Sequence, residues 1–281
     1  MDKRYGILIV SVTIFVLCFV GTASATNWSV DGSGGADFTG IQDAINNASD
    51  GDMIIVHSGV YYENVVVDKS VTLRGIGQPV VDARWRGKSV VTLSADGITV
   101  ERFNVTKGSW EGAGITISSS NNTITGNTVC HSNKGGIALY SSSNNTITDN
   151  NISNNGGGID LWHPSNNNTI TGNNVSNNNY DGISLYYSSN NKIYFNNFIN
   201  NTDNVDSYKS TNIWNSPLEI TYTYDGTTYK SYLGNYWDDY EGTDADGDGI
   251  GDTHYSIYSE SDDYPLMKPF ENYILPRSAS I

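Results

Sequence analysis

The chain has 281 residues, a formal net charge of −15, and 29 glycines against 6 prolines. This acidic balance argues against nucleic acid as a partner, because proteins that bind nucleic acid carry basic patches. The polar composition alone would suit a disordered chain, but the regular spacing of apolar residues described below excludes one.

The first 25 residues have the pattern of a secretory signal peptide. Lys3 and Arg4 form a charged start, residues 7–20 are an apolar run, and residues 23–25 read Ala-Ser-Ala, a small-residue cleavage site. The apolar run is short for a membrane span, and no second long run follows. We therefore expect a secreted chain that begins near Thr26, has no transmembrane segment, and keeps Cys130 as its single cysteine without an internal disulfide.

One short helix is predicted near the start of this secreted part. In the segment 37–52, "DFTGIQDAINNASDGD", Ile41, Ala44, Ile45 and Ala48 form one apolar face. The segments that follow, "DMIIVHSGVYYENVVV" and "SVTLRGIG", are typical of strands. We expect the helix to cover the open N-terminal end of the strand-rich region, since a terminal repeat needs a protective cover.

The middle of the chain repeats with a period of about 23 residues. Three apolar columns define the repeat: Ile124, Ile147, Ile170 and Ile193; Val129, Ile152, Val175 and Phe198; and Ile115, Ile137, Ile159 and Ile183. The first two columns are spaced by 23, and the third by 22, 22 and 24. A fixed period with variable turns indicates a solenoid, and the short alternating runs within each unit indicate strands.

The predicted fold is therefore all-β, a right-handed single-stranded parallel β-helix of about seven coils. A short N-terminal helix caps one end, and a β-hairpin with an acidic loop caps the other. We divide the chain into a signal peptide (1–25), the β-helix with its N-terminal cap (26–210) and a C-terminal cap (211–281).

Asparagine recurs at two fixed places in each coil. The two sets are Asn122, Asn145, Asn168 and Asn191, and Asn127, Asn150, Asn173 and Asn196. Asparagine tolerates the left-handed conformation that sharp corners need, and stacked amides can hydrogen-bond along the solenoid axis. We expect both sets to be structural ladders. The same composition creates nine Asn-x-Ser/Thr sequons, which are possible glycan sites or chance products of the repeat.

Three segments carry a resemblance to known proteins. The stretch "VDGSGGADFTGIQDAINNASDGDMIIVHSGVYYENVVV" resembles the N-terminal segment of pectinesterases and other carbohydrate-associated β-helix proteins. The "SNNTITGN" coils resemble NosD-type repeats, also described as carbohydrate-binding and sugar-hydrolase domains. The tail "LGNYWDDYEGTDADGDGIGDTHYSI" is similar to archaeal cell-surface members of that group. The resemblance implies a β-helix at the cell surface, and it leaves lyase, hydrolase, epimerase, copper-related and non-catalytic functions open.

One coil differs from its neighbours on the predicted outward face. In "GIDLWHPS", Ile159 and Leu161 point inward, which places Asp160 and Trp162 outward. The same phase gives an aromatic stripe of Tyr140, Trp162 and Tyr186, with His163 and Tyr187 at the next position. Aromatic faces stack on sugar rings, and Asp and His bond hydroxyl groups. We predict saccharide binding by Tyr140, Asp160, Trp162, His163, Tyr186 and Tyr187, against the alternative of an ordinary exposed face.

Catalysis at the same face is a second hypothesis. Asp160 with His163 would need another carboxylate for glycoside hydrolysis, and Asp181 is a possible neighbour. Lyase chemistry would need a cation to neutralise a uronate, and few Lys or Arg residues lie near the stripe. The motifs of pectinesterases and polygalacturonases are absent from this sequence, which argues against those activities.

The sharpest local signal is "DADGDGIGD" at 244–252. Asp244, Asp246 and Asp248 alternate, Gly249 permits a sharp turn, and Ile250 offers its backbone carbonyl, as in the opening of a calcium loop. Asp252 completes the predicted calcium ligands, and Asp262 or Asp263 could supply a further carboxylate. Before this loop, Asp225-Gly226 marks the turn of a predicted hairpin.

Copper is the other metal that the resemblance raises. Its usual ligands are His, Met and Cys. The candidates are scattered without ligand spacing, and they are His57, His131, His163, His254, Met53, Met267 and Cys130. From the sequence we favour a monomeric secreted or cell-surface protein that binds a polysaccharide or surface glycan without catalysis and is stabilised by Ca²⁺. A polysaccharide lyase, hydrolase or epimerase, and a NosD-like copper-related accessory protein, are the alternatives.

Overall fold

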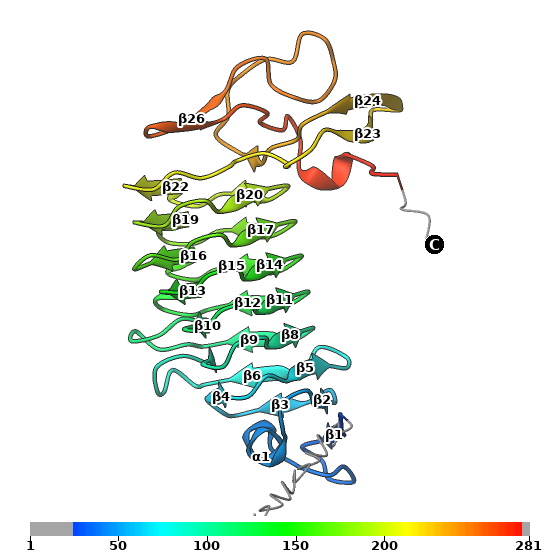
Figure 1. Ribbon diagram of the computed structural model, residues 1–281, viewed down its shortest axis with the longest axis vertical. Helices are drawn as coiled ribbons and strands as arrows, with labels where there is room; N and C mark the ends of the chain where they lie inside the picture. The colour runs from blue at the N-terminus through cyan, green and yellow to red at the C-terminus, as the bar shows by residue number, and fades with distance from the viewer. Residues whose placement is uncertain (1–24, 277–281) are drawn as a thin grey trace, which may run out of the picture.

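The computed structural model describes residues 25–276, in which three parallel sheets form one stack of coils (Figure 1). Sheet A consists of β1 (Asn27–Val30), β2 (Met53–Val56), β5 (Thr72–Gly75), β8 (Thr99–Glu101), β11 (Thr123–Thr125), β14 (Thr146–Thr148), β17 (Thr169–Thr171) and β20 (Lys192–Tyr194). Sheet B consists of β3 (Val60–Tyr61), β6 (Val80–Asp82), β9 (Asn104–Thr106), β12 (Thr128–Cys130), β15 (Asn151–Ser153), β18 (Asn174–Ser176), β21 (Asn197–Ile199) and β25 (Tyr236–Trp237). Sheet C consists of β4 (Val65–Val67), β7 (Val91–Leu93), β10 (Ile115–Ile117), β13 (Gly135–Tyr140), β16 (Gly157–Trp162), β19 (Asp181–Tyr186) and β22 (Asp203–Tyr208).

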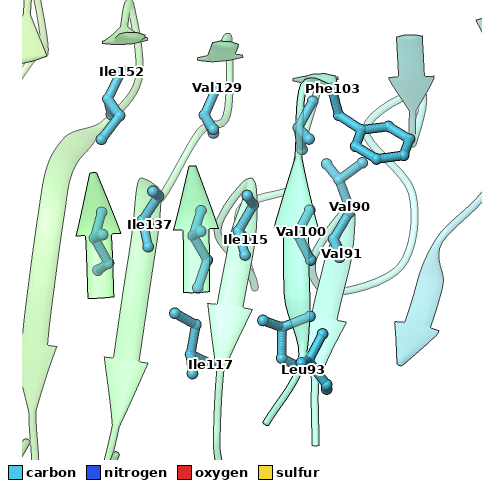
Figure 2. Close-up of a cluster of buried hydrophobic side chains, with 14 of the residues drawn as sticks. Val90, Val91, Leu93, Val100, Phe103, Ile115, Ile117, Val129, Ile137 and Ile152 are labelled. Atoms are coloured by element: carbon cyan, nitrogen blue, oxygen red, sulfur yellow. The ribbon is translucent and has the colours of Figure 1, made fainter. Parts of the chain in front are cut away.

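The predicted parallel β-helix is confirmed, with about eight turns where the repeat predicts about seven. The strands beyond seven coils are β1, which pairs in parallel with β2, and β25, which pairs in parallel with β21; both lie outside the periodic region. Each predicted apolar column is in register: Ile124 pairs with Ile147, Val129 with Ile152, and Ile137 with Ile159. These columns are fully buried and fill the interior of the solenoid, as Figure 2 shows for residues between Val90 and Ile152.

The predicted helix is α1 (Ile41–Asn47), which lies at the N-terminal end of the stack (Figure 1). Its apolar face is buried against β1, β2 and β4. Glu63 accepts hydrogen bonds from the backbone of Ile41 (2.9 Å) and Gln42 (2.8 Å) at the start of the helix. Lys69 donates to three carbonyls at its end, including that of Ala48 (2.7 Å). These charges match the helix dipole and hold the cap on the first coils.

The C-terminal segment forms the other cap. The predicted hairpin is β23 (Ile220–Tyr224) and β24 (Thr227–Ser231), with Asp225 and Gly226 both at positive φ, as a two-residue hairpin turn requires. A second hairpin pairs β26 (Tyr255–Ile257) with β27 (Glu260–Asp262), and the 3₁₀ helix η1 (Phe270–Asn272) follows. Since β25 continues sheet B beyond residue 210, the C-terminal cap adds a last rung to the β-helix.

The two predicted asparagine ladders are present. Asn122 donates its side-chain amide to Asn145 (2.8 Å), and Asn127 does the same to Asn150 (3.0 Å); the later rungs repeat this contact. The conformational role differs from the expected one, because the left-handed residue is the one before each rung. Asn121, with a φ of 60°, turns the chain, and the ladder residue Asn122 points inward.

The predicted signal peptide lies outside the described residues except for its last residue. Among the described residues, no helix has the length and apolar character needed to cross a membrane.

Candidate functional site

A row of aromatic side chains follows the outward face of sheet C. Tyr140, Trp162, Tyr186 and Tyr208 occupy equivalent positions at the ends of β13, β16, β19 and β22. The ring centroids of Trp162 and Tyr186 are 5.3 Å apart, and those of Tyr186 and Tyr208 are 5.1 Å apart. The predicted stripe therefore exists and continues onto Tyr208, which the sequence analysis did not include.

His163 and Tyr187 lie beside this row, at the corner where the chain leaves sheet C. Both are exposed and have a positive φ, of 57° and 52°. The His163 ring lies 6.1 Å from Trp162, and Tyr187 accepts a hydrogen bond from Lys209 (3.0 Å). Neither side chain reaches the cleft described next, so the structure does not bring Asp160 and His163 together at one site.

A cleft of about 310 Å³ lies between the same face of sheet C and the turns that lead into it from sheet B. Its floor is formed by Asp160 and Ser184, which are neighbours in register on β16 and β19. Its walls are aromatic and charged, and they are formed by Trp110, Asn133, Lys134, Trp162, Tyr180 and Asp181. Trp110 and Tyr180 are 75% and 62% exposed, so their ring faces are open to a ligand.

The Asp160 carboxylate is held close to two glycines. A Cβ atom added to Gly135 would lie 2.5 Å from the carboxylate, and one added to Gly157 would lie 3.2 Å from it. Glycine at these positions therefore makes room for the acid. Burial, with a smaller contribution from the negative charge of Asp181, raises the pKa of Asp160 to about 7, and Lys134 opposes the shift. Near neutral pH this carboxyl group can both donate and accept a proton.

Asp181 begins β19 and lines the same cleft, so the two predicted carboxylates do lie together. Burial raises the pKa of Asp181, and Asp206 and Asp203 on the next strand add to the shift by repulsion. Sheet C therefore carries an acidic patch, of which Asp160 and Asp181 line the cleft.

The sequence analysis missed the walls of the cleft. Trp110 and Tyr180 belong to turns, where the 23-residue period does not predict which way a side chain points. Trp110 lies in a long turn between β9 and β10. From the sequence we expected few cations near the stripe, and the structure places Lys134 and Lys209 there. Lys134 lines the cleft and lies 5.4 Å from the ring of Tyr140, and Lys209 lies 5.2 Å from the ring of Tyr208. Lys134 belongs to a turn, so it is distant from Trp162 in sequence but lines the same cleft.

The cleft continues along the turns between sheets B and C. A second depression of about 140 Å³ shares Trp110, Asn133 and Tyr180 with the first and extends to Trp85 and His131. A third shares Trp85 and Trp110. Trp110 lines all three depressions, which follow one another along the turns of several coils, and we call the three together the groove.

The predicted calcium loop brings three carboxylates together. One oxygen from each of Asp244, Asp246 and Asp248 lies within 4.8 Å of the other two. Asp244 also accepts hydrogen bonds from the backbone of Gly247 (2.8 Å) and Gly249 (2.9 Å), and this shapes the loop. Gly249 has a φ of 89°, as the predicted sharp turn requires.

The other predicted ligands lie around this triad. Ile250, Asp252 and Asp263 line one depression of about 210 Å³ together with Asp246 and Asp248. Asp262, the alternative to Asp263, is fully buried at another place, where it accepts hydrogen bonds from Asn235 (2.8 Å) and Trp237 (3.0 Å). Asp263 is therefore the better placed of the two.

Comparisons with known proteins agree with this architecture. The model of the family described as "Periplasmic copper-binding protein (NosD)" matches residues 41–242. A cell surface glycoprotein of Methanothermus fervidus is 33% identical over 110 residues, which are 38% of this chain and 18% of that protein. The match thus spans less than a fifth of that relative.

Two solved structures share the fold at low sequence identity. Pectate lyase Pel9A has a TM-score of 0.55 at 17% identity, over 66% of this chain and 56% of that one. An alginate lyase from Paenibacillus sp. has a TM-score of 0.50 at 16% identity, over 66% of this chain and 74% of that one. At this identity the similarity concerns the fold alone.

The described residues do not fit the copper that the family description names. Copper sites favour His, Met or Cys ligands. Between residues 25 and 276, three or more His, Cys, Asp or Glu ligand atoms gather at the triad of Asp244, Asp246 and Asp248 alone, which offers hard oxygen ligands. Cys130 instead contacts the side-chain oxygens of Asn104 (3.9 Å) and Thr106 (3.7 Å).

Proposed function

Because the chain belongs to the NosD family of proteins, we propose that it is a cell-surface β-helix protein that binds a saccharide in the cleft beside Asp160. The observation that carries this proposal is the arrangement of Trp110, Trp162 and Tyr180 around an acidic floor. Aromatic rings stack on the apolar faces of sugars, while carboxylate, amide and ammonium groups bond the hydroxyls. All of these groups line the same cleft.

The length of the groove supports a chain of sugars as the ligand. Trp85 provides one further exposed ring face beyond the cleft itself, and Trp110 lines both the cleft and the depressions that contain Trp85. A single sugar in the cleft would leave Trp85 uncovered. The row of Trp162, Tyr186 and Tyr208 offers a second direction in which a chain could continue.

The proposal is tested by binding to an array of surface and matrix polysaccharides, followed by titration with oligosaccharide fragments of the best ligand. We expect Trp110→Ala and Trp162→Ala each to weaken binding by about three- to tenfold, the loss of one stacking contact. Unchanged affinity in both variants would contradict the proposal. Tyr62→Ala is the matched control, because Tyr62 is 57% exposed and does not line the groove.

A second candidate function is polysaccharide cleavage in the same cleft. The pKa of Asp160, raised to about 7, favours it, because a protonated carboxyl can give its proton to a glycosidic oxygen. Water would add its hydroxyl group to the anomeric carbon, and Asp181 would accept the remaining proton. Lys134 supplies the nearby positive charge that an acidic substrate would need.

Cleavage is measured as new reducing ends after incubation with each polysaccharide that binds. We expect Asp160→Asn to abolish the products while binding persists. If wild type binds a polysaccharide but releases no product from it, the catalytic candidate fails and the binding function stands.

We also propose that the triad of Asp244, Asp246 and Asp248 holds a calcium ion with a structural role. Calcium takes six to eight oxygen ligands, and carboxylates with one backbone carbonyl suit it. The Ile250 carbonyl, Asp252 and Asp263 line the depression beside the triad and are the candidates to complete the set. The location at the cell surface rests on the predicted signal peptide and on the cell surface glycoprotein to which the chain is similar.

A further inference from the structure

Three sequons form a column at the corner between sheets C and A. They are Asn121-Asn122-Thr123, Asn144-Asn145-Thr146 and Asn167-Asn168-Thr169, one on each of three successive coils. In each sequon the middle residue is a buried ladder asparagine, so the fold fixes where its two neighbours point.

The first asparagine of each sequon turns outward. Asn121, Asn144 and Asn167 are exposed and have φ angles of 60°, 58° and 57°. The left-handed conformation at the corner directs their side chains away from the solenoid. Among the described residues, none of these three side-chain amides makes a hydrogen bond, whereas the ladder amide one position later makes at least two.

The threonine of each sequon also faces outward. Thr123, Thr146 and Thr169 pair in register on β11, β14 and β17, with the buried isoleucine column on the inward side. Both groups that define an N-glycosylation acceptor, the amide and the hydroxyl two residues later, are therefore on the surface in all three coils.

The other sequons differ in at least one of the two groups. Asn151 is exposed like the column residues, but the Ser153 hydroxyl of its sequon accepts a hydrogen bond from Asn154 (3.2 Å). Asn174 has its side-chain oxygen buried, and Asn47 donates its amide to the Asp43 carbonyl (2.8 Å). The sequon at Asn200 has its hydroxyl engaged, because Thr202 donates to the Asn179 carbonyl (2.9 Å). Chance explains the sequons of a repeat rich in Asn and Thr, but it does not explain why one column keeps both groups free.

We propose that Asn121, Asn144 and Asn167 are N-glycosylation acceptors. In the reaction, the amide nitrogen forms a bond to the anomeric carbon of a lipid-phosphate-linked oligosaccharide. The bond from that carbon to the phosphate oxygen breaks, and the amide gives up one proton as the lipid phosphate leaves. The fold accepts a glycan at these positions, because the modified side-chain nitrogen is exposed and takes no part in the hydrogen bonds of the asparagine ladder.

The column lies away from the turns that form most of the cleft. The turns from sheet B into sheet C supply Trp110, Lys134 and Tyr180, whereas the column follows the turns from sheet C into sheet A. Trp162, at the end of β16, is the cleft residue on the side of the column. This inference does not depend on the proposed binding function, and each can fail without the other.

The experiment is glycopeptide mass spectrometry of the full chain secreted from a host that glycosylates a reference sequon protein. We expect glycan mass on the peptides that contain Asn121, Asn144 and Asn167, and its loss at one position in Asn144→Gln. Unmodified peptides at all three positions, in a host that modifies the reference protein, would overturn the proposal.

The next coil provides a matched test of position. Asn190 has the same exposure and a φ of 60°, but Lys192 replaces the threonine, so the sequon is missing. Lys192 is exposed and pairs in register with Thr169. Lys192→Thr should add one glycan, at Asn190, and Lys192→Ala should add none. A folded Lys192→Thr protein without that glycan would show that the corner position is not an acceptor.

Discussion

Asp160 is an acidic residue whose ionised form is destabilised by its place in the fold. Its carboxylate occupies a half-buried cleft beside a second acid, Asp181, with Lys134 as the nearby cation. A purely structural residue at this outward position would be Ser or Ala, as in the neighbouring coils, where Ser184 and Ala138 pair with it. The ionised acid therefore reduces the stability of the fold, which Ser or Ala at this position would not do.

This gives a prediction for the pH dependence of stability. Because the folded pKa of about 7 lies above the unfolded value near 4, the protonated form is favoured in the fold. The stabilisation from Asp160 is complete below about pH 4 and is lost as the pH rises to about 7. We expect Asp160→Asn to gain about 2–4 kcal/mol in the free energy of unfolding relative to wild type at pH 8 and little at pH 4.

Urea unfolding of wild type and Asp160→Asn at both pH values measures this difference. Burial also raises the pKa of Asp262 to about 7, so the free energy of unfolding of both proteins falls with rising pH for this second reason. Only the difference between wild type and variant therefore reports on Asp160. Ser184→Asn on the next coil is the control for adding an amide to the cleft. An equal gain at pH 4 and pH 8 would contradict the assigned cause.

For single residues, the sequence predicted which strand side chains point inward, but it did not predict the cleft residues that belong to turns. Ile159 and Leu161 follow from strand alternation, and that phase also places Asp160 and Trp162 outward. Trp110 and Lys134 could not be placed, because a turn residue has no period and its direction depends on the length of the turn. The position of Asp181 was left open for the same reason.

At the scale of elements, the asparagine ladders show how the stack of coils begins and ends. Each rung donates its amide to the next rung toward the C-terminus, so the last rung needs an acceptor that does not have to donate. Asp262 fills this place for one ladder, since Asn235 donates to it from both its backbone (2.8 Å) and its side chain (3.3 Å). The ladder asparagines were predictable from the period, but this ending was not.

A third ladder, through Asn155, Asn178 and Asn201, ends in the same way. It passes to Asn204, whose amide donates to Asp238 (2.9 Å) and Asp239 (2.7 Å). The ladder of Asn122 ends differently, because the side-chain nitrogen of its last residue, Asn212, is buried without a hydrogen-bond partner among the described residues. The C-terminal cap thus presents carboxylates to two of the three columns of amides.

A central rung should contribute strongly to stability. Asn150 accepts two hydrogen bonds from Asn127, and it donates to Asn173 (3.0 Å) and to the Ile124 carbonyl (2.9 Å). Asn150→Ala leaves several buried groups without partners, so we expect a loss of about 2–4 kcal/mol in chemical unfolding. The neighbouring Asn151 is exposed, and Asn151→Ala should cost less than about 0.5 kcal/mol. Similar losses in the two variants would refute the ladder's energetic role.

The end of the ladder gives a second prediction at this scale. Asp262→Ala removes the acceptor of Asn235 and Trp237 in a site with no solvent access, and we expect a loss of about 2–4 kcal/mol. Asp262→Asn keeps one oxygen for these donors and should lose less. The control is Glu219→Ala, an exposed partner of Lys230 (3.0 Å), with an expected change within about 1 kcal/mol. If Asn and Ala at position 262 are equally damaging, the acceptor role is wrong.

At the scale of the whole molecule, the solenoid is a stack whose stability depends on its two ends. Each coil is buried by its neighbours, so an open end exposes unpaired strand edges and apolar side chains. The first end is closed by α1, and the last is closed by the segment from β23 onward (Figure 1). The acidic loop belongs to this second cap, because Tyr222 donates to the Asp248 carbonyl (3.0 Å) and Tyr229 to the Gly247 carbonyl (2.9 Å).

Calcium should therefore stabilise the molecule through its C-terminal cap. With extracellular-type affinity and 10 mM Ca²⁺, binding adds about 1.5–3 kcal/mol, which raises the Tm of a chain this size by roughly 3–10 °C over its value in chelator. The variant with Asp246→Asn and Asp248→Asn should lose this difference, and in chelator it should melt above wild type because the carboxylates no longer repel. Mg²⁺ should give a smaller shift, since it requires a tighter octahedral site. Equal melting of wild type with Ca²⁺ and with chelator, or a shift that survives in the double variant, would exclude calcium from the cap.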